Sequence, residues 1–153
     1  MSKVVAIDGP AGSGKSTVAK ELAKALGWSF LDTGAMYRAV TALALRNEVD
    51  PHDSQAVARL AENCQIETLP RVTINGLDVT TEIRQQPVTE TVSLVASNPH
   101  VRANMVARQR EWAQRQPIGT VVEGRDIGSV VFPDATLKAV SYTHLTLPTI
   151  LLV

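Results

Sequence analysis

The sequence predicts an α/β fold in which helices flank a parallel sheet and a small antiparallel insert interrupts the chain. The first observation is an uninterrupted apolar run at residues 4–7, which is followed by a glycine-rich loop and an amphipathic segment. The second is a short apolar run at residues 29–31, which completes a strand–helix–strand unit. The third is a change near residue 65 from helical spacing to alternating polar and apolar residues.

The first elements are marked by their apolar spacing. β-Branched residues dominate positions 4–7, as is typical of a strand that is buried on both faces of its sheet. Residues 16–26 predict a helix because apolar residues recur every four positions, and Gly27 is a typical residue beyond a helix end. The next helix is expected over residues 35–46.

The antiparallel insert is expected at about residues 65–80. The stretches "IETL" and "RVTI" alternate polar and apolar residues, with Pro70 between them. Asn75 and Gly76 then form a strong signal for a two-residue hairpin turn before "LDVT".

Caps and apolar runs predict the remaining elements. Asp53 or Ser54 can cap one helix, Asn98 can cap another, and Pro87 and Pro99 suit the first turn of a helix. These signals predict helices over about residues 54–63, 88–96 and 101–115, and further parallel strands over residues 119–122 and 135–140.

The composition is that of one globular domain. Hydrophobic residues make up 44% of the 153 residues, and fifteen basic residues balance fifteen acidic ones, which gives no case for nucleic-acid or membrane binding. Cys64 is the sole cysteine, so no disulfide forms within the chain, and we expect a buried, inert thiol. The sequence has no leader-like start and no apolar run long enough to span a membrane, so a monomeric protein of the cytoplasm is expected.

The glycine-rich loop "GPAGSGKS" is the strongest chemical signal. It matches G-x-x-x-x-G-K-S between a predicted buried strand and a predicted helix. In such loops the backbone N–H groups surround a nucleotide phosphate, the lysine (here Lys15) reaches the β- and γ-phosphates, and the serine (Ser16) ligates Mg²⁺. The plainer alternative is a tight strand-to-helix turn with no ligand.

A second anion site is expected at "LDTGAMYR". This stretch follows the second predicted strand, where ligands collect in open α/β sheets. Thr33 and Gly34 can offer a hydroxyl and an N–H group, and Arg38 can bind a phosphate one turn further along. No Asn–Lys pair of a guanine-reading motif occurs, so the length and the two anion sites favour a small-molecule kinase.

Four motifs together resemble one family. "IDGPAGSGKST", "LDTGAMYR", "NPHVR" and "VVEGRDIGSVVFPDA" are similar to bacterial cytidylate kinases, from about Val4 to Lys138. The resemblance implies a P-loop nucleoside monophosphate kinase domain over residues 1–138, which transfers phosphate from ATP, with Mg²⁺, to CMP or dCMP. It also implies that the insert at about residues 65–80 belongs to the CMP-binding part.

The resemblance assigns roles to individual residues. ATP would be held by Gly9, Pro10, Ala11, Gly12, Ser13, Gly14, Lys15, Ser16 and Thr17, with the metal ion on Ser16. CMP would be held by Thr33, Tyr37, Arg38, Ser93, Arg102, Arg125 and Asp126. Lys15, Arg38 and Asp126 are the expected catalytic residues.

Plainer interpretations remain open for several of these residues. Asp126 can instead cap a turn, Arg125 can pair with Glu123, and Ser93 can be a surface hydroxyl. Arg108, Arg110 and Arg115 are expected on the solvated face of a helix.

Residues 139–153 depart from the family. They contain no Asp, Glu, Lys or Arg, and they do not continue into the arginine-rich lid that the family has at this point. A frameshift, or foreign sequence joined to the end of the read, is the favoured explanation, and a natural short variant is the alternative. We expect Pro148 to prevent strand pairing here, and we expect the chain as written to bind nucleotides weakly and to turn over CMP hardly at all.

Two other functions stay open on the sequence alone. The chain can be another P-loop kinase for a small metabolite, which a panel of acceptor substrates would reveal. It can also be a non-catalytic nucleotide-binding module, which would bind nucleotides without turnover.

Overall fold

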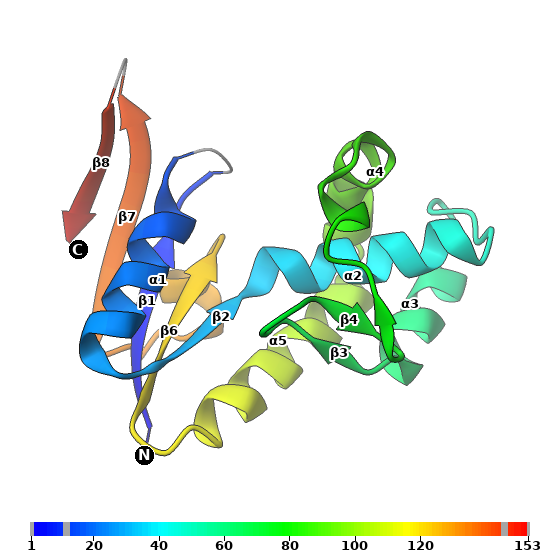
Figure 1. Ribbon diagram of the computed structural model, residues 1–153. Coiled ribbons are helices and arrows are strands. Elements are labelled where there is room, and N and C mark those ends of the chain that lie inside the picture. The colour runs from blue at the N-terminus through cyan, green and yellow to red at the C-terminus, as the bar shows by residue number, and fades with distance from the viewer. Residues whose placement is uncertain (1, 11–12, 145–146, 153) are drawn as a thin grey trace. The chain divides into compact units, whose positions relative to one another are not determined.

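The computed structural model describes residues 2–10, 13–144 and 147–152. The chain folds as two compact units, of which the first comprises Met1–Gly34 and Gln109–Val153 and the second comprises Ala35–Arg108. Figure 1 shows the elements of both units. In the described part of the chain, no helix combines the length and the hydropathy that crossing a bilayer requires.

The first unit contains a five-stranded sheet. Its strands are β1 (Lys3–Asp8), β2 (Ser29–Asp32), β6 (Gly119–Gly124), β7 (Leu137–His144) and β8 (Leu147–Leu152), in the spatial order β2-β6-β1-β7-β8. The first four strands in this order run parallel, and helix α1 (Lys15–Leu26) covers one face of the sheet (Figure 1). The predicted parallel α/β fold is therefore confirmed.

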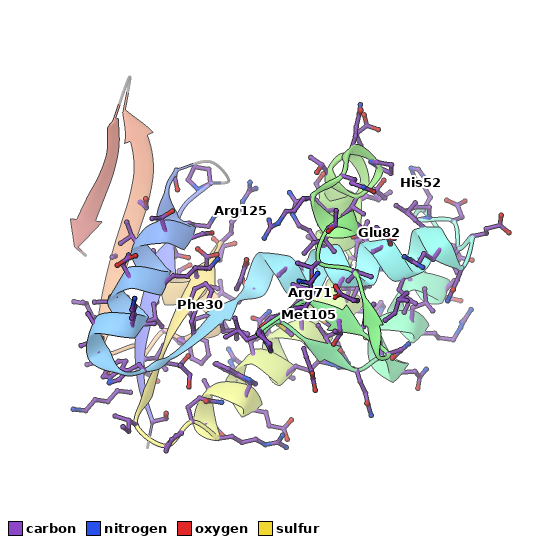
Figure 2. All side chains as sticks on the ribbon, viewed as in Figure 1. Phe30, His52, Arg71, Glu82, Met105 and Arg125 are labelled. Carbon is purple, nitrogen blue, oxygen red and sulfur yellow. The ribbon has the colours of Figure 1, made fainter. Side chains whose placement is uncertain are left out.

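The core of the first unit lies between α1 and the sheet. Phe30, labelled in Figure 2, is buried there beside apolar residues of β1 and β6. All four residues predicted for the first buried strand, 4–7, are buried, and Gly27 ends α1 with a positive φ of 66°. The buried cluster consists of Val5, Ile7, Ala19, Ala23, Phe30, Val121 and Ala139.

The last strand corrects one expectation. β8 pairs antiparallel with β7, and Thr143 stands opposite Pro148, so the prediction that this proline would prevent pairing is wrong. The physical reason is that β8 lies at the edge of the sheet and pairs with β7 alone. A proline, which has no N–H group to donate, is tolerated in an edge strand because no second neighbouring strand needs that hydrogen bond.

The second unit holds helices and the antiparallel insert. Its elements are α2 (Thr33–Arg46), α3 (Ser54–Asn63), β3 (Ile66–Glu67), β4 (Thr73–Ile74), β5 (Leu77–Asp78), η1 (Glu82–Arg84), α4 (Gln86–Ala96) and α5 (Pro99–Gln114), of which α2 and α5 continue across the unit boundary. The strands pair in the order β3-β4-β5, as predicted. Asn75 and Gly76 both have positive φ, as the predicted hairpin turn requires. Arg71, labelled in Figure 2, forms an ion pair with Asp78 across the hairpin.

The predicted helix caps are present. Asp53 accepts a hydrogen bond from the N–H of Ala56 at 3.1 Å, and Asn98 accepts one from the N–H of His100 at the same distance. Pro87 and Pro99 both lie in the first turn of a helix. These contacts are local in sequence, which is why the sequence alone could predict them.

Of the arginines that were expected on a solvated face of α5, Arg110 is exposed but Arg108 is half-buried, and both hold backbone oxygens. Arg108 donates to the backbone oxygens of Cys64 at 2.7 Å and Ala61 at 2.8 Å, at the end of α3. Arg110 donates to the backbone oxygen of Val131 at 2.8 Å. Cys64 is a free, buried cysteine, and burial raises the pKa of its thiol, which is consistent with an inert side chain.

Candidate nucleotide-binding site

The glycine-rich loop connects the carboxyl end of β1 to the start of α1. Gly14 takes a left-handed conformation with φ of 84°, and α1 begins at Lys15. The Lys15 Nζ atom donates to the Pro10 backbone oxygen at 3.2 Å, across the loop. Ala11 and Gly12 lie outside the described residues. The loop thus places Lys15 and Ser16 in the first turn of a helix, where backbone N–H groups favour an anion.

Ser13 adds a second indication of a ligand. Its side chain is 1% exposed, and its Oγ atom has no hydrogen-bond partner within the described part of the chain. Buried polar atoms are nearly always hydrogen-bonded in folded proteins. An unpartnered hydroxyl in this loop therefore supports the predicted phosphate site.

Three neighbouring strands each carry a carboxylate at or next to their carboxyl end. Asp8 ends β1, Asp32 ends β2, and Glu123 is the penultimate residue of β6. Asp32 stands opposite Glu123 in the sheet register, and Asp8 stands opposite Gly124. The sequence analysis gave none of the three a nucleotide-binding role, although each is the polar residue that directly follows an apolar run.

Glu123 contacts the predicted metal ligand. Its Oε1 atom accepts a hydrogen bond from the Ser16 hydroxyl at 2.6 Å, whereas its Oε2 atom is buried without a hydrogen-bond partner among the described residues. Burial, followed by the negative charge of Asp32, raises the pKa of Glu123 to about 7, although Ser16 and Lys15 act in the opposite direction. The Ser16 hydroxyl therefore occupies one oxygen of Glu123, which is the carboxylate that Arg125 was alternatively expected to pair with.

This oxygen-rich group fits a magnesium ion. Mg²⁺ usually binds to one or two carboxylates together with substrate phosphates and water. Ser16 and Glu123 offer oxygen donors beside the loop, and the unpartnered Oε2 atom can accept a hydrogen bond from a metal-bound water. The described residues contain no cluster of three or more His, Cys, Asp or Glu side chains suited to a metal, so a bound ion would need oxygens from the nucleotide.

We expect the Glu123→Gln substitution to stabilise the protein above pH 7. Between pH 4.5 and about 7, Glu123 keeps its proton in the folded protein, whereas it loses the proton in the unfolded protein. The free energy of unfolding of the parent therefore falls as the pH rises through this range. Glutamine is neutral at every pH. The unfolding free energy of the variant should rise relative to that of the parent as the pH increases from 4.5 to about 7, measured by urea denaturation at several pH values.

The control for this experiment is Glu21→Gln. Glu21 is an exposed glutamate on α1 in the same unit. Its substitution should give a difference that hardly changes with pH. A pH-independent difference for Glu123→Gln would mean that the carboxylate titrates normally in the folded protein.

Three of the seven predicted CMP residues lie in the first unit. Thr33 is buried, and its hydroxyl donates to the Glu123 backbone oxygen at 2.8 Å. Arg125 and Asp126 are exposed and line a cavity of about 920 Å³ together with Gly9 and Pro10 of the glycine-rich loop. The structure therefore brings the "GRD" motif beside the glycine-rich loop within one unit.

The other four CMP residues lie in the second unit. Arg38 on α2 donates through Nη1 to the Ile83 backbone oxygen at 2.8 Å and to the Thr89 hydroxyl at 3.0 Å. Tyr37 is half-buried on the same helix, Ser93 is exposed on α4, and Arg102 is half-buried on α5. Thr89 lies 51 residues from Arg38, so no local sequence signal pointed to this contact.

Comparisons with known proteins agree with these motifs. The model of the family described as cytidylate kinase matches residues 5–142. The chain is 54% identical over 140 residues to the cytidylate kinase of Mycolicibacterium paratuberculosis and 53% identical over 136 residues to that of Solibacter usitatus. It is also 52% identical over 141 residues to a bifunctional pantoate ligase/cytidylate kinase of Prochlorococcus marinus.

These relatives are longer than the chain. Each match covers 88% of the chain, but only 61% and 58% of the two cytidylate kinases and 28% of the bifunctional protein. The chain thus spans about three fifths of the length of the cytidylate kinases that it matches.

Proposed function

Since this chain belongs to the cytidylate kinase family, we propose that it contributes the ATP-binding loop and CMP-binding residues of an enzyme that phosphorylates CMP and dCMP. The reaction moves the γ-phosphoryl group of ATP onto the phosphate of the acceptor nucleotide. The P–O bond to ADP breaks as a new P–O bond to the acceptor forms. The acceptor phosphate is already ionised at neutral pH, so no general base is needed to activate it.

The donor side of this proposal rests on the glycine-rich loop. Residues 9–17 would bind the phosphates of ATP through backbone N–H groups at the start of α1. Lys15 would release its contact with the Pro10 oxygen and donate to the β- and γ-phosphates instead. Mg²⁺ bound near Ser16 and Glu123 would supply further neutralisation of the phosphate charge.

The acceptor side rests on two residues with different tasks. Arg38 would bind the phosphate of CMP, since a guanidinium group can donate two parallel hydrogen bonds to it. Asp126 would accept a hydrogen bond from the amino group of cytosine. Uracil has a carbonyl oxygen at that position, so a carboxylate favours CMP over UMP.

One observation supports the proposal most directly. Gly9 and Pro10 of the phosphate loop line the same cavity as Arg125 and Asp126. A protein that only held ATP would not need residues suited to a pyrimidine at this place. The shared cavity favours phosphoryl transfer between two nucleotides over a module that binds one.

The test is the preference for cytosine and its dependence on Asp126. We expect calorimetry to show that the parent protein binds CMP and dCMP more tightly than UMP. In Asp126→Ala the dissociation constant for CMP should rise about tenfold, the value of one hydrogen bond to a charged group, while that for UMP changes less.

Asp134→Ala is the matched control, because Asp134 is an exposed aspartate only eight residues further along the chain. It should leave both nucleotides bound as in the parent. Alanine at position 126 is strained by the left-handed backbone conformation there, and this strain should weaken the binding of CMP and UMP equally. Equal losses for CMP and UMP in Asp126→Ala would therefore contradict the base-reading role.

A further inference from the structure

Asp8 lies at the junction between the sheet and the glycine-rich loop. It is the last residue of β1, directly before Gly9. Its carboxylate accepts two backbone hydrogen bonds, from the N–H of Ile127 to Oδ1 at 2.5 Å and from the N–H of Gly128 to Oδ2 at 2.9 Å. Both donors are more than 115 residues away in sequence. One charged side chain thus ties the end of β1 to a distant turn.

The turn that Asp8 holds carries the predicted base-reading residue. Asp126 takes a left-handed conformation with φ of 57° and ψ of 27°, and it immediately precedes a π-helical turn, η2 (Ile127–Val131). Residues other than glycine enter this conformation only at a cost, so the surrounding structure must hold them there. The backbone oxygen of Asp126 accepts from the N–H groups of Val130 and Val131, which closes the far side of the turn.

The near side of the turn depends on Asp8. The N–H groups of Ile127 and Gly128 are the first two donors after Asp126, and both point to the Asp8 carboxylate. Hydrogen bonds from N–H groups to an ionised carboxylate are shorter and stronger than those between neutral groups. Asp8 therefore fixes the backbone on the carboxyl side of Asp126. This backbone conformation in turn sets the direction in which the Asp126 side chain points.

The packing around this contact leaves little room for displacement. A β-carbon on Gly128 would lie 3.1 Å from the Lys138 side chain and 3.3 Å from the Asp8 Oδ2 atom, and one on Gly124 would lie 2.0 Å from the Thr33 hydroxyl. The N–H of Gly9 also donates to the Gly124 backbone oxygen at 3.2 Å. The strand end, the phosphate loop and the turn are therefore in direct contact.

We propose that Asp8 is a positioning residue for cytosine recognition, which acts by holding the backbone of the turn that presents Asp126. This role rests on the proposed function, because it assumes that Asp126 contacts the base. Asp8 also lines the cavity shared by Gly9, Pro10, Arg125 and Asp126, but in this account both of its carboxylate oxygens stay bonded to the N–H groups of Ile127 and Gly128 and do not contact the nucleotide. Asp8 is thus a further residue of the proposed CMP site, and the sequence alone predicted no role for it.

The decisive variant is Asp8→Asn. An asparagine side chain offers one acceptor oxygen and an NH₂ group, so one of the two N–H donors would lose its partner and face another donor. We expect the dissociation constant for CMP, measured by calorimetry, to rise about tenfold. The preference for CMP over UMP should fall as it does in Asp126→Ala, and ADP binding should change by less than about twofold.

A double-mutant cycle separates positioning from general damage. If Asp8 acts through Asp126, then Asp8→Asn should weaken CMP binding far less in the Asp126→Ala background than in the parent. Asp134→Asn, at an exposed aspartate of the same segment, should change nothing in either background. Additive losses, or equal losses for CMP, UMP and ADP, would overturn the proposal.

A second variant leaves Asp8 intact. Gly128→Ala places a methyl group 3.1 Å from the Lys138 side chain and 3.3 Å from the Asp8 Oδ2 atom, so the turn and these neighbours should shift by a few tenths of an ångström, with a smaller but equally selective loss of CMP. This variant decides the question if Asp8→Asn does not fold. A parent protein that fails to bind CMP would overturn the proposed function, whereas CMP binding that is unchanged in either folded variant would overturn the role of Asp8 alone.

Discussion

Replacing Lys15 by alanine should weaken the binding of Mg·ATP by about a hundredfold or more while the fold remains intact. A hydrogen bond to a charged group is worth about 1.5–3 kcal/mol, and Lys15 would donate to both the β- and γ-phosphates. The structure indicates why the fold should survive. The side chain makes an exposed hydrogen bond to the Pro10 oxygen, and such a contact contributes little to stability.

The measurement is calorimetric titration of the parent and of Lys15→Ala with Mg·ATP, together with thermal unfolding of both proteins. Lys24→Ala is the matched control, since Lys24 is an exposed lysine in the last turn of the same helix, α1. It should bind Mg·ATP as the parent does. If Lys15→Ala binds equally tightly, the glycine-rich loop is only a strand-to-helix turn.

Replacing Arg38 by methionine should raise the dissociation constant for CMP by about ten- to a hundredfold. Methionine keeps much of the apolar stem of the side chain but removes the guanidinium group that would bind the acceptor phosphate. The loss should be the same for CMP and UMP, because both carry that phosphate. This equality distinguishes Arg38 from Asp126, whose removal should affect CMP selectively.

The structure also defines the control for Arg38. Arg46 lies on the same helix, α2, and its guanidinium forms an ion pair with Glu82, a residue labelled in Figure 2. Because such partly exposed pairs contribute little, Arg46→Met should leave both stability and CMP binding nearly unchanged. A comparable loss of CMP binding in both variants would show that the effect comes from damage to the helix and not from a phosphate contact.

Lysine at position 38 refines the same test. Arg38→Lys keeps the positive charge but loses the planar guanidinium fork that can donate two parallel hydrogen bonds to a phosphate. It should recover only part of the CMP binding that Arg38→Met loses. Full recovery would mean that charge alone, and not geometry, serves the acceptor phosphate.

The sequence by itself determined most of the helices and strands and the position of the glycine-rich loop between β1 and α1. Apolar runs gave the parallel strands, Asp53 and Asn98 marked helix starts, and Asn75 with Gly76 marked the hairpin turn. Each of these signals acts between residues that are a few positions apart. Local backbone preferences and capping hydrogen bonds are sufficient to set them, so no knowledge of the tertiary structure was needed.

Only the tertiary structure decided which polar side chains meet. The contacts from Glu123 to Ser16 and from Asp8 to Ile127 join residues 107 and 119 positions apart. They exist because β1, β2 and β6 run parallel and bring their carboxyl ends to one edge of the sheet. The pairing of β8 and the partners of Arg108 likewise depend on chain segments that pack from a distance. A one-dimensional pattern does not contain sheet order and register, so it can name candidate residues but cannot say which of them share a hydrogen bond.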